Sequence, residues 1–315
     1  MSKRPKIVVI GSMIFDFVAR AQRLPRKGET LLGTGFGMYT GGKGANQAVQ
    51  AGRLGAEVHM VGRVGADYQG ERVIRSLRES GVNTDYVIAD HDVETSVCCI
   101  HVDANGDNDI IISPGANMAC SVEDIDKARD IILSSDIAMF QLEIPIPVIE
   151  YAIKMVSDRG IPIILNPAPA NKVPENLFAK AKIITPNETE AEAFSGIPAC
   201  DDGKGGWEKQ AAERLMALGS ETVIITLGKR GALLAEKGKC KTIPTFSHIK
   251  AVDTTAAGDA FNGALAVALA EGKEMEEAVV FANAAGSLAA SRPGAQSSLC
   301  TRQELEALLK TGPAY

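Results

Sequence analysis

The sequence predicts an α/β fold: a doubly wound, mostly parallel central sheet with helices on both faces, accompanied by a small β-sheet lid. Helical and strand-like segments alternate along most of the 315 residues, which is the pattern of parallel strands joined by crossover helices. Two extended stretches in the N-terminal half interrupt the alternation. The length suffices for one large core with an insertion.

The first part of the chain contains short apolar strands and amphipathic helices. Helix 68–79 carries Val73, Ile74 and Leu77 on one face, the spacing of a helix that buries a single stripe. The predicted strands here are residues 6–10, 13–21 and 57–61, and the predicted helices are residues 45–54 and 68–79.

The second part continues the alternation. The predicted helices are 124–133, 147–158, 188–194, 207–218, a helix that includes Phe261, and 275–290. The predicted strands are 137–142, 162–165, 183–184 and 222–227. Residues 231–244 are expected to form a hairpin at one edge, turning at 236–239.

The interrupting stretches, residues 14–41 and 94–113, are both strand-like. The second contains the turn Asn105-Gly106 between two apolar runs, which is typical of a hairpin. We expect the two stretches to pair into a lid, and residues 1–13, 42–93 and 114–315 to form the core. A small sheet with an apolar face and open edges favours a partner, so we expect a homodimer through the lid.

Composition excludes several classes of protein. Hydrophobic residues make up 45% and charged residues 23%, and the net charge of −6 disfavours nucleic-acid binding. No apolar run is long enough for a bilayer span or a signal peptide. Six scattered cysteines indicate reduced thiols and a cytoplasmic protein. The four histidines show no metal-ligand spacing, so any metal should be a hard cation bound by oxygen.

Residues 253–261, Asp-Thr-Thr-Ala-Ala-Gly-Asp-Ala-Phe, place a small-residue turn at the start of a helix. The first N–H groups of a helix have no partner within it and attract an anion. Asp259 stands beside them and could accept a proton. An anion site next to a base suits phosphoryl transfer to an alcohol, although an ordinary helix start is the alternative.

A glycine-rich segment, residues 37–44, precedes the helix that carries Lys43 and Asn46. It nearly matches a P-loop, but Gly44 replaces the Ser or Thr that would hold Mg²⁺. Alternatively, the glycines let the backbone approach a small polar ligand, with Lys43 and Asn46 donating to hydroxyls. A plain glycine-rich turn also remains open.

Two carboxylates follow apolar strands. Asp16 comes shortly after the first strand and Glu143 follows the strand 137–142. Ligands of α/β sheets bind at this edge, and a carboxylate can accept hydrogen bonds from vicinal hydroxyls of a sugar. Each residue alone is equally compatible with a solvated loop.

Two further segments are candidates for a nucleotide or metal site. Asn187 and Glu190 form a capping-box pattern and could also approach hydrated Mg²⁺. The turn Thr226-Leu227-Gly228 could contact a nucleotide, or could be a simple β-turn.

Five motifs occur in one order and together resemble the ribokinase/PfkB family of sugar kinases over residues 11 to about 298. They are Gly-Lys-Gly-Ala-Asn at 42–46, Gln-Leu-Glu at 141–143, Asn-Pro-Ala-Pro-Ala at 166–170, Asn-Glu-Thr-Glu at 187–190 and Asp-Thr-Thr-Ala-Ala-Gly-Asp at 253–259. The resemblance implies a ribokinase-like fold and ATP-dependent phosphorylation of the 5-hydroxyl of a pentose, with D-ribose expected first.

The resemblance also implies roles for individual residues. Asp259 is expected to be the catalytic base, and Ala256, Ala257 and Gly258 the anion hole. The expected sugar-binding residues are Asp16, Gly42, Lys43, Asn46, Glu143 and Asp259. The expected ATP-site residues are Asn187, Thr226, Gly228, Gly231, Gly258 and Asn283. Asn187 and Glu190 are expected to hold Mg²⁺ through water. An activating K⁺ is expected among Asp253, Thr255, Ala289, Arg292, Gly294 and Ser298.

One position departs from the family pattern. Ile14 stands where an asparagine is usual, and deoxyribose kinases of the family are similar in having an apolar residue there. Loss of a hydrogen-bond partner for a buried hydroxyl changes discrimination by roughly 1–3 kcal/mol. A 2-deoxyribose kinase, or another pentose or nucleoside kinase, is therefore the same-class alternative. A P-loop NTPase and a catalytically silent sugar sensor are the alternatives from other classes.

Overall fold

A nine-stranded sheet with the order β13-β12-β11-β10-β9-β8-β1-β4-β5 runs through the protein. The computed structural model describes residues 4–171, 173–174, 176–200, 206–236 and 238–313. Neighbouring strands run parallel except at β12, which is antiparallel to both β11 and β13. Strands β12 and β13 form the predicted edge hairpin; residue 237, within the predicted turn 236–239, lies outside the described residues. The strands are β1 (Lys6–Ile10), β4 (Glu57–Gly65), β5 (Val82–Asp90), β8 (Ile137–Phe140), β9 (Ile163–Leu165), β10 (Lys182–Ile184), β11 (Thr222–Thr226), β12 (Ala232–Glu236) and β13 (Lys239–Ile243).

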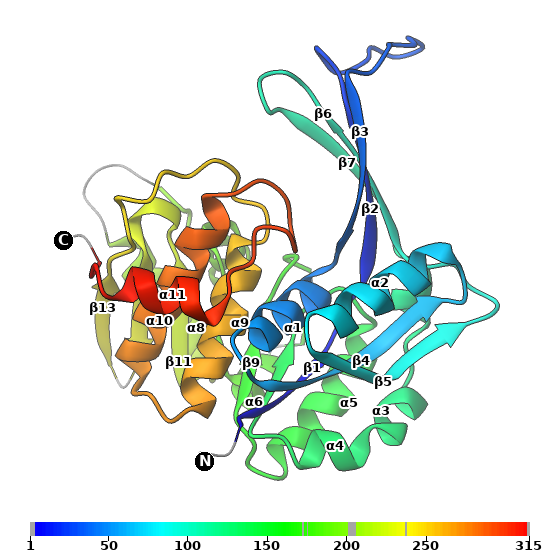
Figure 1. Ribbon diagram of the computed structural model, residues 1–315. Helices are drawn as coiled ribbons and strands as arrows, with labels where there is room; N and C mark the ends of the chain where they lie inside the picture. The colour runs from blue at the N-terminus through cyan, green and yellow to red at the C-terminus, as the bar shows by residue number, and fades with distance from the viewer. Residues whose placement is uncertain (1–3, 172, 175, 201–205, 237, 314–315) are drawn as a thin grey trace.

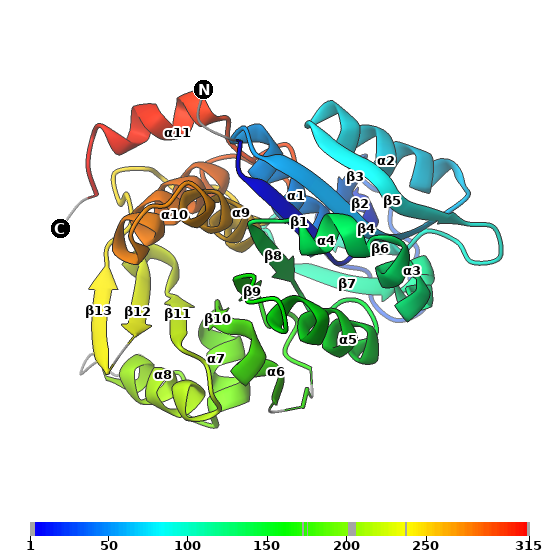
Figure 2. The same cartoon turned by 90° about the horizontal axis from the view of Figure 1, so that it is seen from below.

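Helices cover both faces of this sheet (Figure 2). One face carries α1 (Lys43–Arg53), α2 (Tyr68–Glu79), α9 (Ala257–Ala270), α10 (Met275–Ala290) and α11 (Arg302–Leu309). The other carries α3 (Val122–Lys127), α4 (Arg129–Leu133), α5 (Ile146–Ser157), α6 (Asn176–Ala181), α7 (Glu188–Ser195) and α8 (Trp207–Ala217). Ile7 and Val9 of β1 point into the first layer and Val8 and Ile10 into the second. The continuous apolar run of β1 follows from this burial on both sides.

The strand order reverses beside β1, which pairs with β4 on one side and with β8 on the other. The loops that leave the carboxyl ends of β1 and β8 therefore run in opposite directions. Such a point in a doubly wound sheet is where ligands bind. Ser12 and Glu143 lie there, joined by a hydrogen bond from Ser12 Oγ to Glu143 Oε2 of 2.5 Å.

A second sheet of four strands, with the order β3-β2-β6-β7, projects away from the main body (Figure 1). It consists of β2 (Ile14–Arg20), β3 (Gly35–Gly41), β6 (Val97–Val102) and β7 (Asn108–Ser113). The two strand-like stretches that interrupt the sequence alternation do pair with each other, through β2 and β6. The prediction of a doubly wound sheet with an additional small β-sheet is confirmed.

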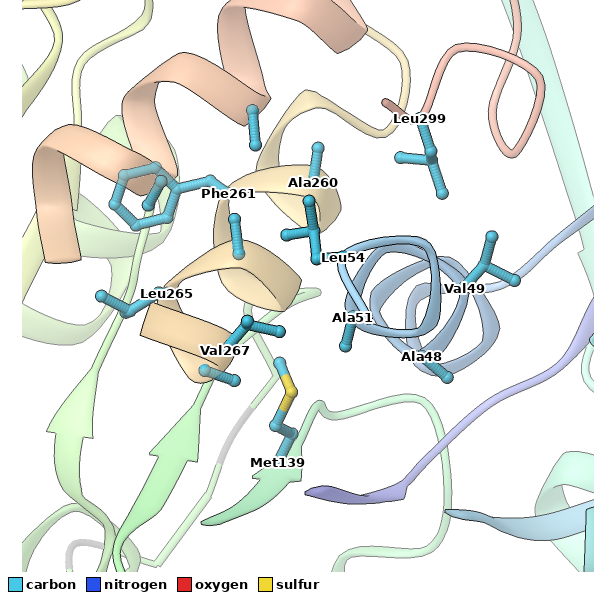
Figure 3. Close-up of a cluster of buried hydrophobic side chains, with 14 of the residues drawn as sticks. Ala48, Val49, Ala51, Leu54, Met139, Ala260, Phe261, Leu265, Val267 and Leu299 are labelled. Atoms are coloured by element: carbon cyan, nitrogen blue, oxygen red, sulfur yellow. The ribbon is translucent and has the colours of Figure 1, made fainter. Parts of the chain in front are cut away.

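Helices α1 and α9 pack directly against each other: the buried side chains of Ala51 and of Leu54, which follows α1, lie on the side toward α9, and Leu54 lies beside Ala260 (Figure 3). Gly263 of α9 lies at the closest approach of the two helices. These small residues bring the N-terminal turns of α1 and α9 together, and both predicted active-site segments begin there.

Several elements differ from the sequence prediction. Strand β5 and helices α6 and α11 were not predicted. The expected helix 124–133 is divided at Ala128, whose N–H is shared between the carbonyl oxygens of Asp124 and Ile125, so α3 ends and α4 starts anew. Strand β8 ends at Phe140 rather than at residue 142, because the N–H of Leu142 donates to Ala168 instead of to a neighbouring strand. None of the described helices has the length and apolar composition that a membrane span requires.

Candidate active site

A cavity of about 180 Å³ opens where α1, α7 and α9 meet the carboxyl edge of the sheet. Its residues come from five of the segments singled out in the sequence and from two further positions, Thr185 and Asn262. The lining residues are Lys43, Asn166, Ala168, Thr185, Asn187, Glu190, Thr226, Thr254, Ala256, Gly258, Asp259 and Asn262. The structure thus brings together Lys43, the 187–190 pair and the start of α9, which lie far apart in the sequence.

The start of α9 has the geometry of an anion site. Ala256 is the N-cap and adopts a left-handed conformation, with φ of 58°. The N–H of Ala257 donates to the carbonyl oxygen of Thr254 at 3.1 Å. Among the described residues, no acceptor lies within hydrogen-bond reach of the N–H groups of Gly258 and Asp259. Of the predicted amides, that of Gly258 is free as expected and that of Ala257 is not, while the amide of Asp259 is an additional free donor.

Asp259 is buried, with 8% of its surface exposed. Its Oδ2 accepts from Asn46 Nδ2 at 2.9 Å and its Oδ1 from Gln47 Nε2 at 3.1 Å. Burial raises the pKa of Asp259 above its usual value, while the charge of Lys43 and the two amide donors oppose this rise. A carboxylate held this way is both oriented and more basic than an exposed aspartate, as a general base requires.

Lys43, in the first turn of α1, is partly buried. Its burial favours the neutral amine, but the carboxylates of Asp259, Glu143 and Glu190 outweigh this effect and raise the pKa of Lys43. The lysine is therefore charged, and the carboxylates of three different segments act on it electrostatically. One cation thus offsets part of the negative charge of three acidic groups in the site.

The segment before α1 is not a P-loop. Residues 37–41 belong to strand β3 of the small sheet, and α1 starts at once after Gly42. Gly42 has φ of 90°, and a Cβ there would lie 2.7 Å from the backbone nitrogen of Ile14. The glycine is required because the backbone of α1 starts directly against the strand that carries Asp16.

Asp16 and Glu143 lie on the same side of the site. Glu143 Oε2 accepts from the N–H of Lys43 at 3.2 Å. Asp16 accepts no hydrogen bond from the described residues, and burial, followed by the charge of Glu143, raises the pKa of Asp16 to about 6. An unpartnered, half-buried carboxylate beside a second one is a natural acceptor for ligand hydroxyls.

The Asn187–Glu190 pair forms the capping box that the spacing predicts. Asn187 Oδ1 accepts from the N–H of Glu190 at 2.8 Å, and Glu190 accepts from the N–H and the side-chain amide of Asn187. Burial is the main cause that raises the pKa of Glu190. Both residues also line the cavity, so the structural and the functional interpretation hold for the same pair.

Other predicted residues lie at different places. Thr226, at the end of β11, lines the cavity. Gly228 and Gly231 form the turn that follows it, where the N–H of Gly231 donates to Gly228. Asn283 is buried and donates from Nδ2 to the carbonyl oxygens of Ile243 and Pro244. Asn283 thus anchors the chain after β13, and neither it nor the two glycines lines the cavity.

The predicted cation segment is a compact pair of loops. Asp253 Oδ1 accepts from the N–H of Thr255 at 2.9 Å and its Oδ2 from the N–H of Gly294 at 2.8 Å. These backbone donors outweigh the effect of burial and hold the pKa of Asp253 below its usual value. The carbonyl of Ala289 accepts from the N–H of Arg292. Ser298 lies in the same turn, where its hydroxyl donates to Ala295.

Sequence inspection missed Thr185 and Asn262 of the cavity wall, and Gln47 beside the base. Gln47 follows Asn46 directly, but its role depends on the position of α9, which no local pattern reveals. Asn262 stands three residues after Asp259 and thus on the same helix face, which is the one signal that could have indicated it.

A doubly wound sheet with free helix amides, a buried carboxylate and a lysine in one cavity defines a phosphotransferase that acts on a small molecule. The family model described as pfkB family carbohydrate kinase matches residues 4–302, and the chain belongs to this family.

Individual relatives agree with this assignment. The chain is 41% identical to ribokinase from Bacillus subtilis, over 96% of this chain and 99% of the relative. It is 36% identical to deoxyribokinase from Salmonella typhi, over 93% of this chain and 94% of the relative. The structure of Arabidopsis thaliana ribokinase complexed with ribose and ATP superposes with a TM-score of 0.90 at 34% identity, covering 98% of this chain and 99% of the other.

Proposed function

We propose that the protein transfers the γ-phosphoryl group of ATP to the 5-hydroxyl of D-ribose, giving ribose 5-phosphate and ADP. The observation that carries the proposal is the position of Asp259, a buried and oriented carboxylate that directly follows the free amide of Gly258. The similarity to relatives named ribokinase, one of them solved with ribose and ATP, supports the choice of substrates.

In the proposed reaction, Asp16 and Glu143 accept hydrogen bonds from ribose hydroxyls, and Lys43 and Asn46 donate to the sugar. Gly42 lets the backbone approach it closely. Asp259 then takes the proton of the sugar's 5-hydroxyl while the oxygen of that hydroxyl attacks the γ-phosphorus of ATP. The free amides of Gly258 and Asp259, at the turn that Ala256 and Ala257 begin, stabilise the charge that develops on the transferred group. The proton moves to Asp259 Oδ, and the electron pair of the broken P–O bond leaves with ADP.

ATP is proposed to bind along Asn187, Thr226, Gly228, Gly231 and Gly258, with Asn283 supporting the adenine side. Asn187 and Glu190 would hold Mg²⁺ through water. The donor set fits, because Mg²⁺ keeps several waters and binds carboxylates beside phosphates. In the described part of the chain, no three His, Cys, Asp or Glu side chains are arranged to hold a metal ion directly. Mg²⁺ would neutralise charge on the ATP phosphates.

A K⁺ site is proposed for the loops of Asp253 and Gly294. The donors are the carboxylate and backbone oxygens of Asp253, Thr255, Ala289, Arg292, Gly294 and Ser298. Oxygen donors of this kind suit a hard cation. Binding of K⁺ can be read without activity, as a rise in melting temperature that NaCl at the same ionic strength does not reproduce.

The small sheet, with the boundaries 14–41 and 94–113, is proposed to act as a lid and as the contact of a homodimer. Closure would exclude water, which competes as phosphoryl acceptor. Its β7 carries three adjacent exposed isoleucines, Ile110, Ile111 and Ile112. We place the enzyme in the cytoplasm, where ATP is available and where the six free cysteines stay reduced.

The test is an assay of ADP release with a panel of pentoses, hexoses and nucleosides, for the wild type and Asp259→Asn. We expect ribose to give the highest kcat/KM, and Asp259→Asn to bind both substrates but to lose at least a hundredfold in kcat, as expected for a general base. Near wild-type turnover by Asp259→Asn would remove Asp259 from its role. Absence of ADP release with every sugar would favour the sensor alternative.

A 2-deoxyribose kinase is the second candidate. Ile14 is 94% buried, at the start of β2, and its backbone nitrogen faces Gly42. An apolar side chain offers no partner to a 2-hydroxyl, and one relative is a deoxyribokinase. The ratio of kcat/KM for ribose and 2-deoxyribose decides between the two sugars.

A further inference from the structure

A chain of buried amide side chains leads away from the carboxylate of Asp259. Gln47 donates from Nε2 to Asp259 Oδ1 at 3.1 Å and to Asn166 Oδ1 at 3.2 Å. Gln141 in turn donates from Nε2 to Gln47 Oε1 at 2.7 Å. Because Gln47 Oε1 accepts, its nitrogen must be the atom that faces Asp259. The orientation of the Gln47 amide is thus fixed from both ends.

The same chain continues to the first turn of α9. Asn166 donates from Nδ2 to the carbonyl oxygen of Thr185 at 3.0 Å, and the Thr185 hydroxyl donates to Asn262 Oδ1. Asn262 donates from Nδ2 to the carbonyl oxygen of Gly258 at 2.8 Å. All of these side chains are buried. We call Gln141, Gln47, Asn166, Thr185 and Asn262 the amide relay.

We propose that Gln47 is a positioning residue that keeps Asp259 ionised and correctly oriented, and that the amide relay ties this base to the amides that receive the phosphoryl group. The proposal rests on the role of Asp259 in the proposed function. Gln47 and Asn262 are connected through Asn166 and Thr185. The proposal assigns both of them to the same reaction.

The first reason is electrostatic. A carboxylate as buried as Asp259 favours its protonated form, in which it cannot take a proton from the sugar. The donors of Asn46 and Gln47 stabilise the ionised form, one at each oxygen. The two bonds also prevent rotation of the carboxylate, and each oxygen keeps a lone pair free for the incoming proton.

The second reason concerns the peptide group between Gly258 and Asp259. Its carbonyl oxygen accepts from Asn262, while its N–H has no acceptor among the described residues. A hydrogen bond accepted by the carbonyl polarises the peptide and strengthens its N–H as a donor. The relay thereby acts on the base at one end and on an anion-binding amide at the other.

Gln50 provides a matched control on the same helix. It is one turn after Gln47 and equally buried, but it donates from Nε2 to the carbonyl oxygen of Cys300 and accepts from the N–H of Cys300. Among the described residues, the hydrogen bonds of its side chain all go to Cys300 and none to Asp259. Substitution of Gln50 therefore removes the same number of buried amide atoms from α1 without touching the base.

The experiment measures kcat against pH for the wild type, Gln47→Met, Gln47→Glu and Gln50→Met, at saturating ribose and MgATP. Saturation keeps Asp16 bound to sugar, so the acid limb of kcat reports the base in the complex. We expect Gln47→Met to lower kcat about tenfold or more and to move the acid limb up by about one pH unit. Gln47→Glu should move it further, because it places a negative charge beside the carboxylate.

Gln50→Met should leave the acid limb in place, even where it lowers the melting temperature. A wild-type acid limb in Gln47→Met, or equal shifts in Gln47→Met and Gln50→Met, would overturn the proposal. If Gln47→Met is not recovered folded, Gln141→Met decides, with a smaller shift in the same direction expected. Asp259→Asn separates the proposed role of Asp259 from that of Gln47. If Asp259→Asn is active, Asp259 is not the general base. If Asp259→Asn is inactive but the acid limb of Gln47→Met is unshifted, only the role of the amide relay is contradicted.

Discussion

Gly263 of α9 faces the carbonyl oxygen of Gln47 in α1 so closely that a Cβ on this glycine would lie 2.7 Å from that oxygen, and 2.8 Å from Cβ of Gln50. The contact fixes the distance between the helix that bears Lys43 and the helix that bears Asp259. The hydrogen bond between Gln47 and Asp259 joins the same two helices. The absence of a side chain at Gly263 therefore sets the geometry of the site.

The first prediction is that Gly263→Ala damages both stability and turnover. The added methyl group meets backbone on the facing helix, which cannot move aside as a flexible side chain could, so α1 and α9 must separate. Overpacking of this kind costs about 1–3 kcal/mol, and the displaced base should lower kcat about tenfold or more. Thermal unfolding and steady-state kinetics measure the two effects. A variant as stable and as active as the wild type would show that the helices tolerate separation.

The second prediction concerns pH. Since the pKa of Asp16 is raised to about 6, its carboxylate is ionised above that pH and protonated below it. We expect kcat/KM for the sugar to fall as the pH drops through about 6, because a protonated carboxyl group loses one acceptor for the sugar hydroxyls. The corresponding Asp16→Asn variant should have low kcat/KM at all pH values and should lack this limb. A limb at pH 6 that persists in Asp16→Asn would assign it to another group.

The same shift has a consequence for stability. The folded protein binds the Asp16 proton more tightly than the unfolded chain does, so Asp16 favours the folded state most below pH 4, and this contribution is lost as the pH rises through about 6. At pH 8 the ionised side chain then destabilises the protein relative to low pH, by about 3 kcal/mol from the size of the shift. Asp16→Asn should therefore be more stable than the wild type at pH 8 and show a smaller gain at pH 4, as measured by urea unfolding.

The third prediction addresses the choice of sugar. Ile14→Asn places a side-chain donor and acceptor at the start of β2, and we expect it to raise kcat/KM for ribose relative to 2-deoxyribose by about tenfold, equivalent to ~1.4 kcal/mol. Ile14→Leu keeps the apolar character and should leave the ratio unchanged. A wild type that already rejects 2-deoxyribose strongly, with no change in Ile14→Asn, would show that the 2-hydroxyl is recognised elsewhere.

The sequence revealed the site wherever the chemistry lies in a contiguous motif. Residues 253–259 and the Asn187–Glu190 pair could be predicted because helix starts and capping boxes have local signatures. Gln47 could not be predicted, since its partner Asp259 lies 212 residues away and meets it only because Gly263 lets the helices touch. The amide of Ala257 was expected to be free, but the left-handed conformation of Ala256 turns that amide towards Thr254.

The fold shows the same division between local and distant causes. Buried strands such as β1 and β11 are continuous apolar runs and were identified directly. Strand β5 was missed because it pairs with β4 alone at the edge of the sheet and buries few of its side chains, so its sequence, Val-Asn-Thr-Asp-Tyr-Val-Ile-Ala-Asp, lacks a clear apolar run. Helix α6 has six residues, too few to show a helical period.

The fourth prediction is that the small sheet holds two copies of the chain together. Strand β7 is an edge strand that exposes Ile110, Ile111 and Ile112, with 51%, 71% and 51% of their surfaces accessible. Alternate residues of a strand point to opposite faces, so the double variant Ile110→Lys/Ile111→Lys places a charge on each face. We expect its mass in sedimentation or light scattering to fall to that of one chain, because a buried unpaired lysine opposes association. The double variant Ile110→Val/Ile111→Val keeps both faces apolar and should retain the mass of the wild type. A charged variant that still sediments as a dimer would mean that the copies meet through another surface.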